Sequence, residues 1–155
     1  MSVELGKVIP KFSIPATGEQ NISAHQFRGK WLIIYFYPKD NTPGCTTEGK
    51  DFRDHYAEFE KLNAVVVGVS RDSVKMHTNF KAKHEFPFEL LADQEEKLCQ
   101  LFDVIKEKNM YGKKLMGVER STFLIDPKGK LAAEWRKVKV KGHIEEILST
   151  LKELS

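Results

Sequence analysis

Two short stretches of the chain are apolar at nearly every position and rich in β-branched and aromatic residues, namely 31–37 and 64–69. Runs of this kind are typical of strands buried on both faces of a parallel sheet. Between them, aromatic residues recur at helical spacing at Phe52, Tyr56 and Phe59, which predicts an amphipathic helix over about 43–62. Because a strand, a helix and a second strand in this order form a parallel crossover, the pattern predicts an α/β fold.

The rest of the chain continues the same alternation. Further expected elements are a helix over 73–84, a strand over 88–92, a helix over 95–104 with Leu98, Leu101, Phe102 and Ile105 inward, a hairpin of strands 122–125 and 131–138, and a helix over 143–154. The segment 106–117 is polar, basic and punctuated by glycine, and we expect a mobile surface loop there. Lysine alternates with valine over 137–141, as in an edge strand protected against aggregation.

Length and composition set the class of protein. A chain of 155 residues fits one domain, 1–155, around a single core. Hydrophobic residues make up 41% and charged residues 30%, which is typical of a soluble globular protein. No secretion signal or membrane segment is recognised, so we expect a cytoplasmic protein. The net charge of +3 is spread along the chain and indicates neither a nucleic-acid nor a membrane surface.

The residues that often carry chemistry are few. Two cysteines, Cys45 and Cys99, are too few for a disulfide framework, so any disulfide is expected to be transient. The five histidines are scattered, with no cysteine pair at ligand spacing; we interpret them as surface residues and expect no metal site. Neither a phosphate loop nor a dinucleotide glycine fingerprint is present, so no nucleotide cofactor is expected.

Cys45 stands at the predicted start of a helix. Thr42 suits the N-cap and Pro43 the first helical position, which places Cys45 in the first turn, where free N–H groups and the helix dipole favour a thiolate. The dipole contributes only about 0.3–1 kcal/mol, and at best about 2. Cys45 also shares a helical face with Phe52, seven residues later, and desolvation on that face opposes ionisation. A reactive thiolate therefore needs a nearby cation; without one, Cys45 is equally well a small packed residue.

The segment 37–46 resembles the peroxidatic motif of the peroxiredoxins, Pro-x-x-x-Thr/Ser-x-x-Cys, with matches at Pro38, Thr42 and Cys45. The resemblance continues over nearly the whole chain, through 12–15, 27–30, 68–73, 110–113 and 120–126. It is strongest to the peroxiredoxin Q branch, also called bacterioferritin comigratory proteins.

The resemblance implies a thioredoxin-like three-layer α/β/α fold with an added N-terminal β-hairpin. It also implies a thiol peroxidase that reduces hydroperoxides through a sulfenic acid on Cys45 and is reduced again by thioredoxin or a similar thiol, without a cofactor, and we expect a monomer. The Thr42 hydroxyl and the N–H groups of Gly44 and Cys45 would donate hydrogen bonds to the departing oxygen, Pro38 would exclude water, and Arg120 would supply the cation. Without the resemblance, Arg120 would be assigned to a solvated surface pair with Glu119.

The sequence differs from the family that it resembles at the position of the second cysteine. Many members of the branch carry a resolving cysteine five residues after the first, where this chain has Lys50, and 77–84 contains no cysteine either. Cys99 is the one remaining internal candidate, at the flank of a predicted helix face where a half-buried structural residue is equally natural. We therefore expect an external thiol to resolve the sulfenic acid, with a Cys45–Cys99 disulfide as the alternative.

A second class of function stays open at this point. Cys45-Thr46-Thr47-Glu48 lacks the second thiol of a Cys-x-x-Cys motif, so dithiol exchange within one motif is excluded. A thioredoxin-like binding module or redox sensor, however, would need the same polarised thiol and no sustained turnover.

Overall fold

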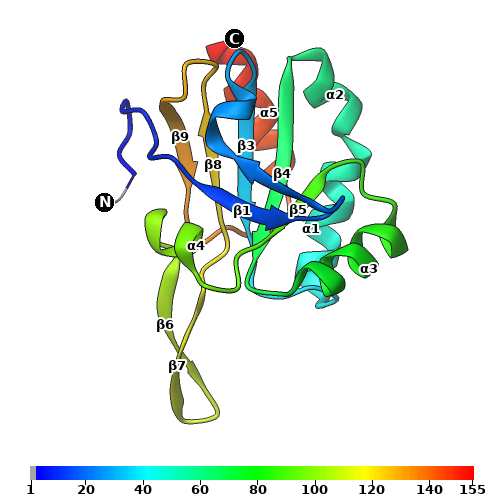
Figure 1. Cartoon of the computed structure of the whole chain (residues 1–155), viewed down its shortest axis with the longest axis vertical. Helices are drawn as coiled ribbons and strands as arrows, with labels where there is room; N and C mark the ends of the chain where they lie inside the picture. Colours follow the sequence, from blue (N-terminus) through cyan, green and yellow to red (C-terminus); the bar gives the residue numbers. More distant parts are fainter. Residues whose placement is uncertain (1–2) are drawn as a thin grey trace.

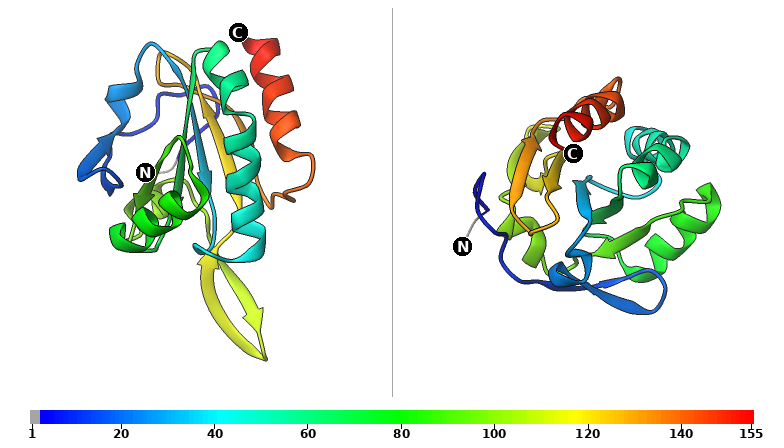
Figure 2. Two further views of the ribbon diagram at one scale, coloured as in Figure 1. Left: turned by 90° about the vertical axis from the view of Figure 1, so that its right-hand side faces the viewer. Right: turned by 90° about the horizontal axis from the view of Figure 1, so that it is seen from above.

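A computed structural model of the chain describes residues 3–155. Seven strands form one mixed sheet in the order β2-β1-β5-β4-β3-β8-β9, with helices on both faces (Figures 1 and 2). The strands are β1 (Ser13–Ala16), β2 (Gln20–Ser23), β3 (Trp31–Phe36), β4 (Ala64–Ser70), β5 (Glu89–Ala92), β6 (Ile105–Met110), β7 (Lys113–Val118), β8 (Ser121–Ile125) and β9 (Leu131–Trp135). The helices are η1 (Ala24–Phe27), α1 (Pro43–Asp54), α2 (Tyr56–Lys61), α3 (Val74–His84), α4 (Lys97–Leu101) and α5 (His143–Leu154).

The parallel centre of the sheet consists of β3, β4 and β5. The segments that follow these strands therefore meet at one edge of the sheet, near the start of α1. Gly68 of β4 lies beside Tyr35 of β3, and a Cβ on Gly68 would stand 2.8 Å from the Tyr35 ring. The glycine thus allows a large aromatic ring to lie flat against the neighbouring strand.

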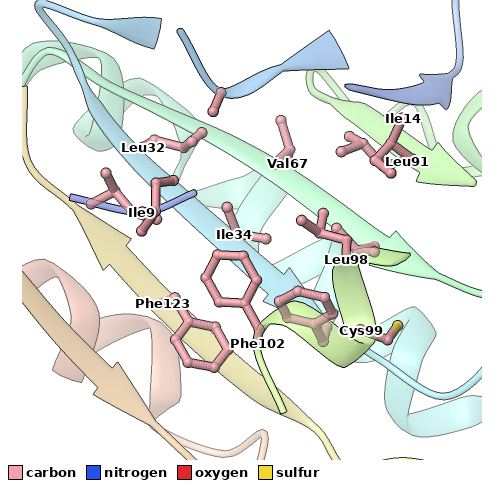
Figure 3. Packing of buried hydrophobic residues seen from close by; sticks show 14 of the residues in the cluster. Ile9, Ile14, Leu32, Ile34, Val67, Leu91, Leu98, Cys99, Phe102 and Phe123 are labelled. Carbon is pink, nitrogen blue, oxygen red and sulfur yellow. The ribbon is translucent and has the colours of Figure 1, made fainter. Parts of the chain in front are cut away.

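Successive side chains of a strand point to opposite faces, and this alternation divides the core in two. On one face, Ile34 packs with Leu98, Cys99 and Phe102 of the α4 region (Figure 3), and Phe36 belongs to the same cluster. On the other face, covered by α1, α2, α3 and α5, the buried residues include Ile33, Tyr35, Cys45, Phe52, Phe59, Phe80 and Ile147. The two cysteines of the chain therefore belong to different cores.

Several expected elements are shorter than the sequence pattern suggested. The helix expected over 43–62 is broken at His55, whose φ of −104° and ψ of 6° are not helical. The Nδ1 atom of His55 lies 2.9 Å from the carbonyl oxygen of Asp51 and shares this acceptor with the helix backbone. Likewise α4 extends only over Lys97–Leu101, because Glu96 and Asp103 adopt left-handed conformations on either side of it.

The prediction of a loop over 106–117 is wrong, although the segment does lie at the surface as expected. Strands β6 and β7 pair in antiparallel register from Ile105–Val118 to Met110–Lys113 and project from the body as a two-stranded ribbon (Figure 1). Tyr111 and Gly112 form the two-residue turn with φ values of 53° and 76°, as a hairpin turn of this length requires. The polar composition concealed this hairpin, because a ribbon exposed on both sides needs no apolar alternation.

The edge strand expected over 137–141 is also absent, since β9 ends at Trp135 and Lys137 has a φ of 51°. In contrast, the hairpin of β1 and β2 confirms the added N-terminal hairpin, and the last helix begins and ends where the pattern placed it. Within residues 3–155, no helix combines the length and apolar character needed to cross a bilayer.

Candidate active site

The Cys45 side chain lies at the start of α1 and points into the aromatic core, only 1% exposed. Its expected orientation on the Phe52 face is therefore confirmed. A helical hydrogen bond joins the N–H of Thr46 to the carbonyl oxygen of Thr42. The N–H groups of Gly44 and Cys45 precede this bond and stay outside the helical ladder, so they remain able to donate hydrogen bonds at the start of the helix.

Arg120, directly before β8, brings its guanidinium to the Cys45 sulfur. Its Nη2 lies 3.3 Å from Cys45 Sγ, and its Nη1 donates a hydrogen bond of 2.6 Å to Glu48 Oε1. The Arg120 side chain is only 16% exposed, so it is not the solvated partner of Glu119 that the sequence alone suggested. A Cβ on residue 44 would come within 3.1 Å of Nη2, and Gly44 therefore leaves the room that the guanidinium occupies.

Glu48 is the member of this group that sequence reasoning missed. Its side chain is fully buried, and burial raises its pKa from 4.5 to about 7, against the opposing effect of the Arg120 guanidinium. Its Oε2 has no hydrogen-bond partner among residues 3–155. A usable signal was present, because Glu48 follows Cys45 by three positions and an acid on the buried face of a helix requires a partner.

Thr42 occupies the N-cap position, as expected, but does not cap the helix. Its backbone is extended, with φ −85° and ψ 153°, and its hydroxyl donates a hydrogen bond of 2.8 Å to the carbonyl oxygen of Lys39. The hydroxyl proton is therefore engaged within the loop, and the oxygen can offer only lone pairs to a ligand. Pro38, at the beginning of this loop, is partly buried beside the fully buried Tyr37.

Cys99 lies in a different environment, in the cluster that contains Leu98 and Phe102 (Figure 3), on the face of the sheet opposite to Cys45. Its side chain is completely buried, and its N–H donates a hydrogen bond of 2.7 Å to Asp93 Oδ2. Burial, together with the negative charge of Asp93, raises the pKa of the Cys99 thiol well above its ordinary value. Neither cysteine forms a disulfide in the described chain.

Two histidines also differ from the interpretation as surface residues. His77 of α3 is fully buried against Asp40, and His143 at the start of α5 is 3% exposed, with its Nε2 2.8 Å from the Thr122 hydroxyl oxygen. Burial lowers the pKa of His143 to about 4, so this ring is neutral near pH 7. Scattered positions in the sequence gave no sign that these residues enter the core.

Comparison with known proteins agrees with the resemblance of the sequence to the peroxiredoxins. The AhpC/TSA family matches residues 5–134. Peroxiredoxin Bcp of Bacillus subtilis is 51% identical over 155 residues, which cover 100% of this chain and 99% of that protein. Peroxiredoxin Bcp of Xanthomonas campestris is 56% identical over 140 residues, covering 90% of this chain and 86% of the relative.

Solved structures give the same result for the fold. A cysteine-to-serine mutant of PrxQ from Xylella fastidiosa superposes with a TM-score of 0.94 at 45% identity, covering 99% of this chain and 98% of that one. The bacterioferritin comigratory protein of Xanthomonas campestris, studied for alkyl peroxide reduction, has a TM-score of 0.89 at 53% identity and covers 92% and 91% of the two chains. The thioredoxin-like fold expected from the resemblance is thereby confirmed, and the alternative of a sensor or binding module gains no support.

A family match across most of the chain, together with relatives at 51% and 56% identity, establishes that this protein belongs to the AhpC/TSA family, in its Bcp or peroxiredoxin Q branch.

Proposed function

We propose that Cys45 is the nucleophile of this thiol-dependent peroxidase and that Arg120 stabilises its thiolate. The observation that carries the proposal is the 3.3 Å contact between Arg120 Nη2 and Cys45 Sγ, made in a buried site at a helix N-terminus. The helix dipole and the guanidinium both act on this sulfur, and low exposure strengthens both effects. At the Cys99 thiol, burial and the Asp93 carboxylate oppose ionisation and outweigh the charge of Arg71.

The chemical step is a displacement at a peroxide oxygen. The Cys45 thiolate attacks the outer oxygen of a hydroperoxide, so that an S–O bond forms and the O–O bond breaks. The departing oxygen leaves as hydroxide or alkoxide and takes up a proton, which yields water or an alcohol and a sulfenic acid on Cys45. The sulfur loses two electrons and the peroxide gains them.

The neighbouring groups have complementary roles in this step. The N–H groups of Gly44 and Cys45 and the Arg120 guanidinium donate hydrogen bonds to oxygen that gains negative charge. The Thr42 hydroxyl donates its proton to the carbonyl oxygen of Lys39, so its oxygen accepts the hydrogen bond that a hydroperoxide O–H donates. This bond orients the substrate. Pro38 limits access of water to the sulfur.

For the substrates, we propose hydrogen peroxide and organic hydroperoxides, because the Xanthomonas campestris relative was studied for alkyl peroxide reduction. The sulfenic acid condenses with one thiol of an external donor to a mixed disulfide and water, and a second donor thiol releases the Cys45 thiol. Thioredoxin or a comparable dithiol protein fits this sequence of steps. A monomer suffices, since the contacts of the site come from one chain.

The decisive experiment is a multiple-turnover assay with hydrogen peroxide and with an organic hydroperoxide, in the presence and absence of thioredoxin. We expect many peroxide molecules to be consumed per protein when the donor is present. Consumption that stops after about one equivalent with every thiol donor would favour a sensor and would end the assignment as a peroxidase.

A further inference from the structure

The loop between β3 and α1, residues 37–42, is held at its centre by one carboxylate. Asp40 has a fully buried side chain, whose Oδ1 accepts a hydrogen bond of 2.6 Å from the Tyr37 hydroxyl. Its Oδ2 lies 2.7 Å from Nδ1 of His77 on α3, and its backbone N–H donates to Asp72 Oδ2 at 2.9 Å. Asp40 therefore ties the loop to the segments that follow β4 and continue into α3.

The protons of this cluster follow from the donor and acceptor inventory. The Nε2 atom of His77 is 2.9 Å from the carbonyl oxygen of Leu91, which can only accept, so Nε2 carries a proton. Nδ1 faces a carboxyl oxygen at 2.7 Å, and one proton must lie between them, on the ring or on Asp40. Burial raises the pKa of Tyr37 well above its ordinary value and keeps it a phenol that donates. The chain Tyr37–Asp40–His77–Leu91 is therefore closed, with a partner for each of these atoms.

The same hydrogen bonds argue against a cation at this place. Asp40, Asp72 and His77 bring possible ligand atoms within 4.8 Å of one another. However, Asp40 Oδ2 and His77 Nδ1 face each other, and Asp72 Oδ2 accepts from the Asp40 N–H and from the Ser70 hydroxyl at 2.6 Å. A cation would have to replace these bonds and displace the shared proton.

We propose that Asp40 and His77 are positioning residues for the peroxidase reaction, and this inference rests on the proposed role of Cys45. Neither residue contacts the sulfur; they fix the loop that presents it. Asp40 stands next to Lys39, whose carbonyl oxygen holds the Thr42 hydroxyl, and two residues before Thr42 itself. The His77 ring thus connects α3 and β5 to the loop that orients the substrate-binding hydroxyl and begins the nucleophile's helix.

The backbone of the loop makes such an anchor necessary. Asn41, between Asp40 and Thr42, adopts a left-handed φ of 64°, which favours asparagine and glycine over other residues but remains uncommon. A surface loop with this conformation and no buried contact would populate several arrangements. The buried carboxylate selects one of them, and displacements of about 1 Å at a reacting group can lower a rate by about 100-fold.

A matched pair of substitutions at His77 tests the proposal. In His77→Asn, the amide nitrogen replaces Nδ1 and keeps the bond to Asp40, whereas in His77→Gln it replaces Nε2 and keeps the bond to Leu91. We expect single-turnover oxidation of Cys45 by hydrogen peroxide to slow by about tenfold or more in His77→Gln and by less than about threefold in His77→Asn. Thermal unfolding of both variants is measured alongside, because a purely structural role predicts that both rates follow stability.

A second pair at Asp40 keeps the proposal testable if a His77 variant does not fold. Asp40→Asn can accept from Tyr37 and donate to a neutral His77 ring, so we expect a nearly normal rate. Asp40→Ala removes both bonds and should slow Cys45 oxidation by about tenfold or more while the fold is retained. Equal rates in Asp40→Ala and the parent protein, or rates that follow thermal stability across all four variants, would overturn the positioning role. Failure of the parent protein itself to react with peroxide would instead overturn the proposed function.

Discussion

The two cysteines of this chain are equally buried and chemically opposite. Cys45 is 1% exposed and Cys99 is 0% exposed, so exclusion from solvent does not distinguish them. Their charged neighbours do, since a guanidinium lies 3.3 Å from the Cys45 sulfur and the Asp93 carboxylate holds the N–H of Cys99. In a buried site one nearby charge has a large effect, and the two sulfur atoms have neighbours of opposite charge.

The two cysteines also differ in the backbone N–H groups around them. Cys45 lies in the first turn of a helix of twelve residues, where its own N–H is free to bind an anion. Cys99 is in a helix of five residues whose first N–H groups are already bound by Asp93, at 3.1 Å from Leu98 and 2.7 Å from Cys99. One helix start is open to a ligand, and the other is closed by a side chain.

The largest expected effect is the loss of activity in Cys45→Ser. A hydroxyl is close to a thiol in size but does not ionise near neutral pH, so we expect an intact fold and no peroxide consumption. Circular dichroism and peroxide assays on Cys45→Ser and on Cys99→Ser, its matched control, measure both properties. Retained turnover in Cys45→Ser would place the nucleophile elsewhere.

The second largest effect on activity is expected for removal of the Arg120 guanidinium. Arg120→Met removes the donor to the sulfur, and we expect the rate of reaction with peroxide to fall by about 100-fold. Arg120→Lys is the control for charge alone, because one ammonium cannot reproduce the two-pronged contact with Cys45 and Glu48. Stopped-flow measurement of Cys45 oxidation by hydrogen peroxide gives the rates, and equal rates in the parent protein and Arg120→Met would show that Arg120 does not support the reaction.

Glu48 is an acidic group near Cys45, as Asp93 is near Cys99, and its protonation is expected to affect stability. Burial raises the Glu48 pKa from 4.5 to about 7 in the folded protein. Between these pH values the unfolded chain releases the proton and the folded chain retains it, so stability falls as pH rises through this range. We expect the parent protein to lose up to about 3 kcal/mol relative to Glu48→Gln between pH 4.5 and pH 7.5.

Urea unfolding of both proteins across this pH range measures the difference in stability. Parallel stability curves would mean that Glu48 stays ionised throughout and that the guanidinium outweighs burial.

The sequence predicted the central elements and the buried helix-start position of Cys45, but not the surroundings that distinguish the two thiols. Continuous apolar runs identified β3 and β4, and the spacing to Phe52 gave the inward orientation of Cys45. Glu48 could have been noticed by its spacing from Cys45, whereas His77 is a polar residue on a buried face for which hydrophobic periodicity carries no signal. The β6–β7 hairpin was hidden for a related reason, since its two exposed faces need no alternation.

Arg120 shows most clearly which contacts cannot be predicted from local sequence. Next to Glu119 in the sequence, it is indistinguishable from a surface ion pair, and its actual partners lie 72 and 75 residues away on α1. Only the arrangement of β8 beside β3 brings the guanidinium to the start of α1. Pairing of this kind depends on the tertiary fold, and here the motif resemblance supplied what local pattern could not.

The smallest effect is expected for Cys99→Ser. We expect this substitution to leave turnover with an external thiol donor unchanged, which tests whether the two thiols act independently. The two thiols lie in separate cores on opposite faces of the sheet, and a disulfide requires Cα atoms within about 7 Å. Direct bonding would require both α1 and α4 to leave their cores. A Cys99 thiol beside Asp93, with its pKa raised, is also a poor attacking group.

Mass spectrometry of peroxide-treated protein without reductant decides between an external and an internal resolving thiol. External resolution predicts the gain of one oxygen atom on Cys45, captured by a sulfenic-acid trap, in the parent protein and equally in Cys99→Ser. Internal resolution predicts the loss of two hydrogen atoms, a crosslinked Cys45–Cys99 peptide and failure of Cys99→Ser to turn over. Internal resolution would mean that the protein unfolds locally in each catalytic cycle, because the sheet lies between the two thiols. The Asp93 carboxylate would then have to release the N–H groups at the start of α4.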